Sequence, residues 1–377
     1  MSLNGVRVAA VGLVTALAAC ASGPNVATGS PAPSTSVSAA ATSQPAGYRV
    51  LLTTSTISSS EVFLYDSASN APQQLASLGA GPAPEAHFIS SQKIAYVDST
   101  NPMTARIMSV DLSTRASTIE LAASGNVPAF AYSHDGASLA YLLHGSADGK
   151  ATLHVRRGGQ EKTLTLNAIP GRGVGRDDEL RLEFAPDDKY LLMVDTFVGN
   201  QGQAPETGQF LVLRAADNTV AFLPPSGVSA NATMATWARH SDRLYYRDQV
   251  GVRTWDAGTT SVGTLATALH WYDPAASPDD GWLAFTDIDA QFVPRVRLYD
   301  LRHNQAIPTV AAARSHPIFV TADTIWYLEE QPCQSECLGG PSQPSGKVLA
   351  YSLKTKAESS LPFTDVHNLS QLAVLSR

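Results

Sequence analysis

The sequence predicts an all-β fold, a seven-bladed β-propeller made of four-stranded antiparallel blades. The first observation behind this prediction is a repeated unit in which a polar turn leads into a strand of alternating apolar and aromatic residues. Clear copies of the unit begin at Ser133, Ala185, Arg239 and Ser277, and weaker copies begin at Ser90 and Thr321. After the amino-terminal segment no stretch keeps an apolar period of about 3.6 residues, so we expect little helix.

The second observation is a further strand that follows each of these six units and has a seventh copy before the first of them. Its copies are VFLYDS from Val62, RIMSVDL from Arg106, LHVRRG from Leu153, FLVLRA from Phe210, VRTWDA from Val252, VRLYDL from Val296 and VLAYSL from Val348. The units repeat every roughly 40 to 53 residues, which is typical of propeller blades rather than of helical repeats. Stacking such four-stranded units around an axis covers their faces and protects their edges.

The two ends of the chain determine the number of blades. The first repeat contains only three strands, over residues 49–53, 61–66 and 73–78, and the chain finishes with a lone strand over residues 370–376. We expect this last strand to pair into the first blade and so to close a ring of seven blades. A six-bladed ring is the alternative, if the first three strands and the last one are additions outside the ring.

The repeated turns carry a resemblance to a known family. SPDDGWLAF from Ser277 and APDDKYLLM from Ala185 resemble the repeats of TolB-type and WD-like bacterial periplasmic propellers, in which FSPDG-x-x-[LI]-[AV]-[YF] marks the inner turn and the second strand. The resemblance covers about residues 48 to 376 and implies the fold, because propellers host many unrelated activities. We expect no room for the hydrolase domain that follows the propeller in enzymes similar to prolyl oligopeptidase.

The amino-terminal segment predicts export. Arg7 precedes an apolar run over residues 8–19, which is too short to span a bilayer but fits a signal peptide. The run ends in Leu17-Ala18-Ala19-Cys20, which resembles the bacterial lipobox. The resemblance implies that residues 1–19 are removed and that Cys20 receives the lipid. The alternative is an ordinary signal peptide, or a buried core segment, with an incidental Cys20.

The residues after Cys20 predict a tether. Residues 21–47 are almost entirely Ser, Thr, Ala, Pro and Gly with few large or charged side chains, a composition that cannot bury enough apolar surface to order itself. We therefore divide the chain into a signal peptide (1–19), a lipidated Cys20 with a disordered tether (20–47) and a propeller (48–377). The expected location is the extracytoplasmic side of the cell membrane, or the outer membrane if the host has one. The outer membrane is implied by the resemblance to lipoproteins, because an acidic residue after the lipidated cysteine commonly signals retention in the inner membrane and Ala21 is not acidic.

Charge and cysteine content narrow the partners. The net charge of −7 argues against nucleic acid, which requires a basic surface. The remaining cysteines, Cys333 and Cys337, lie in a loop rich in Gly and Pro, and in an oxidising compartment we expect them to form a disulfide. A zinc site there would need two further ligands, and no nearby His supplies them.

Two regions are candidates for binding. The long connections, over residues 170–179, 199–208, 225–232 and 329–346, should all fall on one face of the ring, where a rigid scaffold can present them to an envelope protein or a small ligand. The second region is the central channel, where the innermost strands meet. The polar residues expected at or beside it are His87, Glu183, His270, Asp273 and His316.

No catalytic motif is present: there is no G-x-S-x-G elbow, no HExxH and no phosphate-binding loop. The tryptophans lie mostly at equivalent repeat positions and predict core packing, with Trp271-Tyr272 the least regular pair. We predict no metal or cofactor. The sequence thus favours a lipid-anchored scaffold for protein interaction or ligand binding, and the alternative is a propeller hydrolase or lyase acting on a sugar, lactone or peptide at the channel.

Overall fold

The structure, a computed structural model, describes fourteen parts of the chain. These are residues 47–55, 58–80, 84–101, 104–144, 151–165, 178–197, 207–224, 235–248, 251–267, 271–289, 291, 293–332, 342–361 and 369–375. All of them lie in one compact unit, Gln44–Arg377. Every regular secondary-structure element in these parts is a β-strand. No helix capable of crossing a membrane occurs among them. Cys20, Cys333 and Cys337, with their predicted lipid and disulfide, lie outside the described residues.

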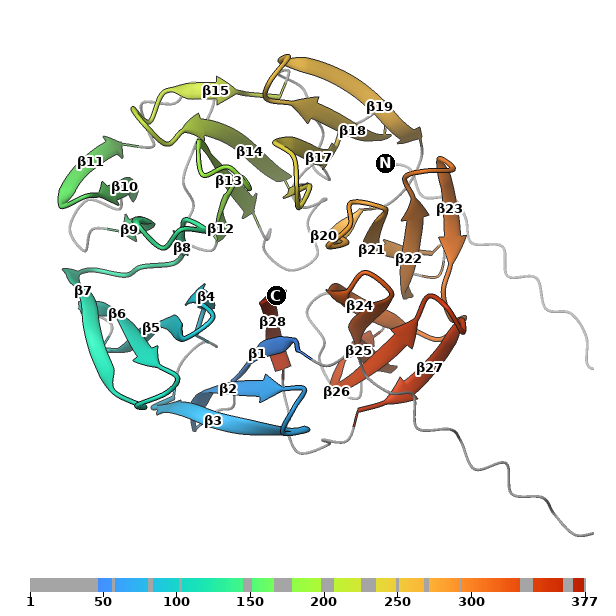
Figure 1. Cartoon of the computed structure of the whole chain (residues 1–377), viewed down its shortest axis with the longest axis horizontal. Coiled ribbons are helices and arrows are strands. Elements are labelled where there is room, and N and C mark those ends of the chain that lie inside the picture. Colours follow the sequence, from blue (N-terminus) through green and yellow to red (C-terminus); the bar gives the residue numbers. More distant parts are fainter. Residues whose placement is uncertain are drawn as a thin grey trace, which may run out of the picture. The chain divides into compact units, whose positions relative to one another are not determined.

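The described strands form seven four-stranded antiparallel sheets, which are arranged as blades around a central axis (Figure 1). From the axis outward, blade 1 consists of β28 (Leu369–Leu375), β1 (Arg49–Ser55), β2 (Ser60–Asp66) and β3 (Ala71–Leu78), and blade 2 of β4 (Ala86–Ser90), β5 (Lys93–Asn101), β6 (Thr104–Asp111) and β7 (Ser117–Ser124). Blade 3 consists of β8 (Phe130–Tyr132), β9 (Ser138–His144), β10 (Ala151–Arg157) and β11 (Gln160–Thr165), and blade 4 of β12 (Asp178–Phe184), β13 (Tyr190–Phe197), β14 (Thr207–Arg214) and β15 (Val220–Phe222). Blade 5 consists of β16 (Ala235–Trp237), β17 (Arg243–Arg247), β18 (Gly251–Asp256) and β19 (Ser261–Thr267), and blade 6 of β20 (Tyr272–Ala276), β21 (Trp282–Ile288), β22 (Pro294–Asp300) and β23 (Gln305–Pro308). Blade 7 consists of β24 (Arg314–Thr321), β25 (Thr324–Pro332), β26 (Ser342–Ser352) and β27 (Ala357–Ser360). The prediction of seven blades is confirmed.

The ring is closed by the two ends of the propeller. β28 pairs antiparallel with β1, and the partners include Val50 with Val374 and Leu52 with Leu372. Blade 1 is therefore assembled from the last strand and the first three, as the sequence predicts.

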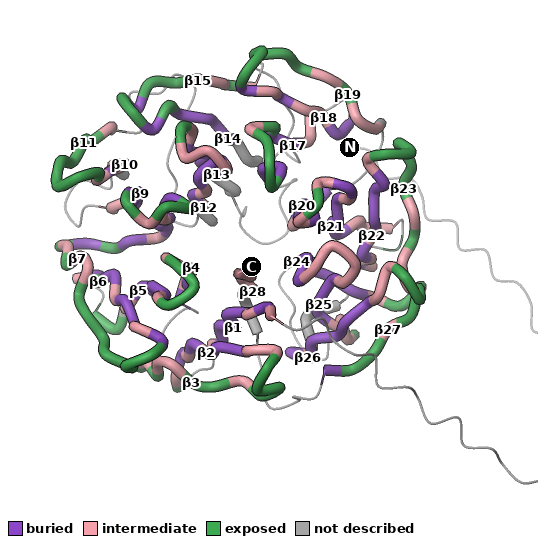
Figure 2. The backbone as a smooth tube through the Cα atoms, in the orientation of Figure 1, coloured by how far each residue is buried: buried purple, intermediate pink, exposed green. Residues whose placement is uncertain are grey.

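The hydrophobic core is divided into seven clusters, one at each junction between neighbouring blades. Figure 2 shows burial concentrated in the middle strands and exposure on the outer strands and turns. The predicted role of the tryptophans is confirmed for Trp237, Trp255, Trp271 and Trp326, which are all buried. Trp271 lies at the junction of blades 5 and 6 and packs on Phe285 with 4.8 Å between ring centroids.

The antiparallel order gives the ring two distinct faces. The turns between the first and second strands (inner turns) and between the third and fourth strands (outer turns) lie on one face, which we call the short-turn face. The connections between the second and third strands, and the links between blades, lie on the other, which we call the long-loop face. The predicted long connections belong to the long-loop face by this topology, and they fall largely outside the described residues.

Each outer turn contains a residue with a left-handed backbone. These residues are Asn70, Arg115, Gly158 with Gly159, Asn218, Thr260, Asn304 and Lys356, in blades 1 to 7 respectively. In blades 1, 2, 5 and 6 an aspartate four residues earlier accepts backbone N–H groups within the turn; for example, Asp111 Oδ1 accepts from Ser113 and Thr114 at 2.9 and 2.8 Å. Aspartate and asparagine suit such turns because their short side chains bond to nearby backbone.

The inner turns contain aspartates that bridge neighbouring blades. Asp280 of blade 6 has a φ of 51°, and its carboxylate accepts the backbone N–H groups of Arg239 and His240 in blade 5 at 2.6 and 3.0 Å. Asp188 of blade 4, with a φ of 60°, does the same for the inner turn of blade 3, at 2.8 and 3.2 Å. These two aspartates therefore connect neighbouring blades as well as forming turns.

We expect Asp280→Asn to lower the free energy of unfolding by about 1–2 kcal/mol, because it removes a charged acceptor shared by two backbone donors. Asparagine tolerates the left-handed backbone, so strain should not contribute. The matched control is Asp323→Asn in the inner turn of blade 7, where the carboxylate is 47% exposed and, within the described part of the chain, pairs only with Lys354, at 2.6 Å. That variant should change stability by less than about 0.5 kcal/mol. Equal effects of the two substitutions in denaturant unfolding would contradict the bridging role.

A carboxyl pair joins the inner turns of blades 4 and 5. The Asp242 carboxyl lies close enough to that of Asp187 for the two groups to interact electrostatically. Burial, followed by the neighbouring carboxyl and the charge of Asp187, raises the pKa of Asp242 to about 6. Burial also opposes ionisation of Asp187, but the ion pair with Lys189 at 2.7 Å and the Lys189 backbone N–H outweigh it and lower the pKa of Asp187. In mildly acidic solution Asp242 is therefore protonated while Asp187 is ionised.

This pair predicts a pH dependence of stability. A carboxyl whose pKa rises from 3.8 to about 6 on folding contributes stability that is present below pH 3.8 and is lost as the pH rises through about 6. Asp242→Asn mimics the protonated form, so we expect it to raise the melting temperature at pH 8 and to have little effect near pH 4. Asp217→Asn provides a control of opposite sign, because hydrogen bonds from Thr219 lower the pKa of Asp217. Parallel melting curves of wild type and Asp242→Asn across this pH range would contradict the prediction.

Candidate functional site

The structure places four of the five predicted channel residues on innermost strands, and the fifth, His270, lies outside the described residues. His87, Asp273 and His316 lie near the beginnings of β4, β20 and β24, and therefore toward the long-loop face. Glu183 lies near the end of β12, next to an inner turn and therefore toward the opposite face. The predicted residues thus occupy both ends of the channel.

Asp273 and His316 come together at the junction of blades 6 and 7. The distance from Asp273 Oδ2 to His316 Nε2 is 3.7 Å, and the two side chains are 26% and 45% exposed. A carboxylate and an imidazole from adjacent inner strands are therefore both accessible to a ligand. Together with Thr286, Ser315 and Glu330, which are described below, this pair forms what we call the Asp273–His316 site.

The backbone of both residues is strained. Asp273 and His316 have φ values of 47° and 54°, a left-handed conformation that is uncommon for residues other than glycine. Each precedes a proline, Pro274 or Pro317, and each lies at an irregularity in strand pairing, between Tyr272 and Ala275 or between Ser315 and Ile318. Such strain persists only where the surrounding structure enforces it, and it is concentrated at functional sites.

Thr286, on the neighbouring strand β21, supports both residues. Its hydroxyl accepts the backbone N–H of His316 at 3.1 Å and donates to Asp273 Oδ2 at 3.4 Å. Thr286 is buried, so its position is fixed by packing. One side chain thus links the strained segments of two blades.

Ser315 and Glu330 orient the imidazole ring of His316. The Ser315 hydroxyl donates to Glu330 Oε1 and lies 2.9 Å from His316 Nδ1. A hydroxyl has a single proton, and because that proton goes to Glu330, Nδ1 of His316 must be the donor to Ser315. The other ring nitrogen, Nε2, is then the atom that faces Asp273 and the solvent.

The same contacts limit the chemistry of the site. Ser315 is only 3% exposed and its hydroxyl proton is committed to a carboxylate, so it is not an activated nucleophile. What remains accessible is a carboxylate and an imidazole nitrogen in fixed positions. This arrangement suits hydrogen-bonded recognition of a ligand.

The other two predicted residues have structural partners. His87 Nε2 lies 2.8 Å from Glu85 Oε1, and Glu85 Oε2 accepts the backbone N–H of Phe130 in the next blade at 3.0 Å. Glu183 forms an ion pair with Arg181. Within the described ranges no group of three or more His, Cys, Asp or Glu side chains could hold a metal ion.

Sequence reasoning missed Thr286, Ser315 and Glu330. A signal was available for part of the site: Tyr272-Asp273-Pro274 and Ser315-His316-Pro317 both place a polar residue before a proline at the start of an inner strand. The partners on β21 and β25 depend on strand register, which no local pattern indicates.

Comparison with known proteins supports the fold. The chain matches no protein-family model and no curated protein sequence. Among solved structures, TolB from Acinetobacter baumannii matches with a TM-score of 0.50 and 15% identity, over 86% of this chain and 66% of that one. The β-propeller domain of the Trilobed protease from Pyrococcus furiosus matches with a TM-score of 0.54 and 13% identity, over 86% and 94% of the two chains.

A puromycin-hydrolyzing peptidase from Mycobacterium tuberculosis also matches, with a TM-score of 0.53 and 12% identity, over 85% of this chain and 54% of the peptidase. The chain thus spans about half of that peptidase and just under two thirds of TolB. At these identities the likeness shows the fold alone: the protein is a β-propeller similar in architecture to TolB.

We expect His316→Gly to leave the free energy of unfolding within about 1 kcal/mol of wild type, because relief of the left-handed strain offsets the lost side-chain contacts. The control is His87→Gly. His87 does not have a positive φ, and its ring packs edge-on against Phe130 with 4.8 Å between centroids, so this change should cost about 1–2 kcal/mol. Denaturant unfolding followed by tryptophan fluorescence measures both. An equally large loss at His316 would mean that its imidazole serves the fold rather than a ligand.

Proposed function

We propose that this protein is an extracytoplasmic, lipid-anchored β-propeller that binds a partner protein or ligand at its long-loop face, through the Asp273–His316 site. The observation that carries the proposal is the combination of accessibility and backbone strain in this pair. Side chains retained on a strained backbone, 26% and 45% exposed, are better explained by recognition than by stability.

The rigid surroundings support a binding role. Thr286, Ser315 and Glu330 fix the pair before any ligand arrives, and a preorganised site loses less entropy on binding. Asp273 offers a carboxylate acceptor and His316 an accessible ring nitrogen, so the site suits a partner that presents a hydrogen-bond donor or a cationic group.

The proposed cellular setting rests on the amino-terminal sequence. We propose that Cys20 carries the lipid, that residues 20–47 tether the propeller and that the membrane is reached only through this anchor. The net charge of −7 and the lack of a run of basic residues in the sequence support a protein or a small molecule, rather than nucleic acid, as the partner.

A second candidate function is a hydrolase or lyase that acts on a sugar, lactone or peptide at the channel. The observation that favours it is the approach of a carboxylate and an imidazole to 3.7 Å, since such a pair can transfer protons. The buried and committed hydroxyl of Ser315 favours binding as the principal proposal.

The proposal is tested by photocrosslinking in the native membrane. A benzophenone amino acid replaces Tyr272, next to Asp273, in one variant and Tyr190, next to an inner turn on the short-turn face, in the control. We expect one specific crosslinked product from position 272, its loss when His316→Gly is added, and no such product from position 190.

Three outcomes would contradict the proposal: a product from position 190 only, a product from position 272 that persists in His316→Gly, or no product from either position. Cys20→Ala serves as the control for anchoring, and we expect this variant in the soluble fraction. If it remains in the membrane, the lipid anchor is wrong whatever the crosslinking shows.

A further inference from the structure

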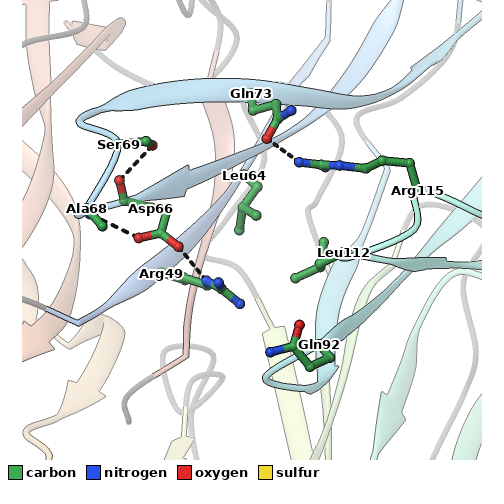
Figure 3. A pocket seen from close by; sticks show the side chains of 9 residues that line it. All are labelled: Arg49, Leu64, Asp66, Ala68, Ser69, Gln73, Gln92, Leu112 and Arg115. Atoms are coloured by element: carbon green, nitrogen blue, oxygen red, sulfur yellow. Dashed lines mark hydrogen bonds and ion pairs between the residues drawn. The ribbon is translucent and has the colours of Figure 1, made fainter.

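A cavity of about 360 Å³ opens on the short-turn face between blades 1 and 2. Its walls include Arg49 and Asp66 from blade 1 and Arg115 from blade 2, and its apolar part is formed by Leu64 and Leu112 (Figure 3). The cavity lies on the opposite face from the Asp273–His316 site, so it does not belong to the proposed function.

Ring closure explains why this junction differs from the others. Between blades 3 and 4, and between blades 5 and 6, an aspartate of one inner turn binds the backbone of the previous inner turn. Blade 1 has no inner turn, because β28 and β1 are the two ends of the propeller. There Arg49 makes the connection instead, and its Nη1 donates to the carbonyl of Ser91 in the inner turn of blade 2 at 2.6 Å.

The two arginines of the cavity differ in whether a carboxylate neutralises their charge. Arg49 is neutralised by Asp66, with 2.6 Å between Nε and Oδ2. Arg115 approaches from the other blade, and its Nη2 donates to the neutral amide oxygen of Gln73. No carboxylate is paired with Arg115 among the contacts of the described residues. The lining therefore carries one more positive than negative charge, on a chain whose net charge is −7.

Arg115 is not required by the shape of its turn. It has a φ of 62°, and blades 1, 4 and 6 have asparagine with the same left-handed backbone at the equivalent position, at Asn70, Asn218 and Asn304. Asparagine is favoured in this conformation and arginine is not. The backbone therefore does not account for the guanidinium beside the cavity.

We propose that this cavity binds a carboxylate attached to a small apolar group. Arg115 pairs with the carboxylate, which a guanidinium can bind through two parallel hydrogen bonds. Leu64 and Leu112, which are both buried, contact the apolar group, and the cavity volume is in the range of small-ligand sites. The carboxylate could belong to a small molecule or to the carboxyl terminus of a peptide, which share this chemistry.

The test compares two probes of nearly the same shape, N-acetyl-L-leucine and its uncharged amide, by ligand-observed NMR with the purified full chain. We expect the carboxylate to bind at least about tenfold more tightly than the amide, because only the carboxylate pairs with Arg115. Arg115→Asn, which installs the residue used in three other blades, should remove this preference without changing the melting temperature.

Lys356→Asn is the matched control, because Lys356 is the cation at the equivalent turn position of blade 7, outside the cavity. It should leave the preference unchanged. Equal binding of acid and amide, or a preference that survives Arg115→Asn, would overturn the proposal. Tighter binding of N-acetyl-Gly-Gly-Leu than of N-acetylleucine assigns the site to a peptide carboxyl terminus, and the reverse assigns it to a small molecule; both results uphold carboxylate recognition.

Discussion

The pairing of the last strand with the first is the interaction on which the rest of the structure depends. No blade has a core of its own, because each hydrophobic cluster is shared between neighbours. The cluster between blades 7 and 1 combines Val50 and Leu52 with Trp326 and Leu328, and Leu372 and Val374 of β28 pack against it. If β28 left the ring, this cluster and the one between blades 1 and 2 would lose part of their cover. Closure therefore makes the stability of all seven blades interdependent.

The two faces of the ring are held in different ways. On the short-turn face, aspartate carboxylates stabilise backbone turns within blades, as at Asp111, and connect the turns of neighbouring blades, through Asp188 and Asp280. Near the long-loop face, strain is concentrated at Asp273 and His316, and buried partners hold it in place. Propellers can combine a rigid scaffold with a variable site in this way, because the scaffold depends on repeated turns and the site depends on a few irregular residues.

The sequence was sufficient for the architecture and for only part of the site. Seven copies of one strand motif and a surplus terminal strand predicted the blade number and the closure, since both follow from local patterns. Asp273 and His316 were recognised as polar residues of inner strands, but their partners Thr286 and Glu330 come from other strands and depend on register. The connection made by Asp280 was also invisible, because its donors lie in another blade. Contacts between repeats arise from the ring geometry, which no single repeat encodes.

Hydrogen exchange of individual backbone amides tests the central claim, a ring closed by β28, most directly. The propeller domain of the Trilobed protease, which matches in fold, is described as having an open velcro topology. An open ring is therefore a real alternative, and closure is not a property of every such fold. If the ring is closed, the amides that pair β28 with β1 should exchange only through global unfolding, with the same opening free energy as those that pair β13 with β14 in blade 4. Exchange of the β28 and β1 amides at a much lower opening free energy, while β13 and β14 remain protected, would contradict the closed ring.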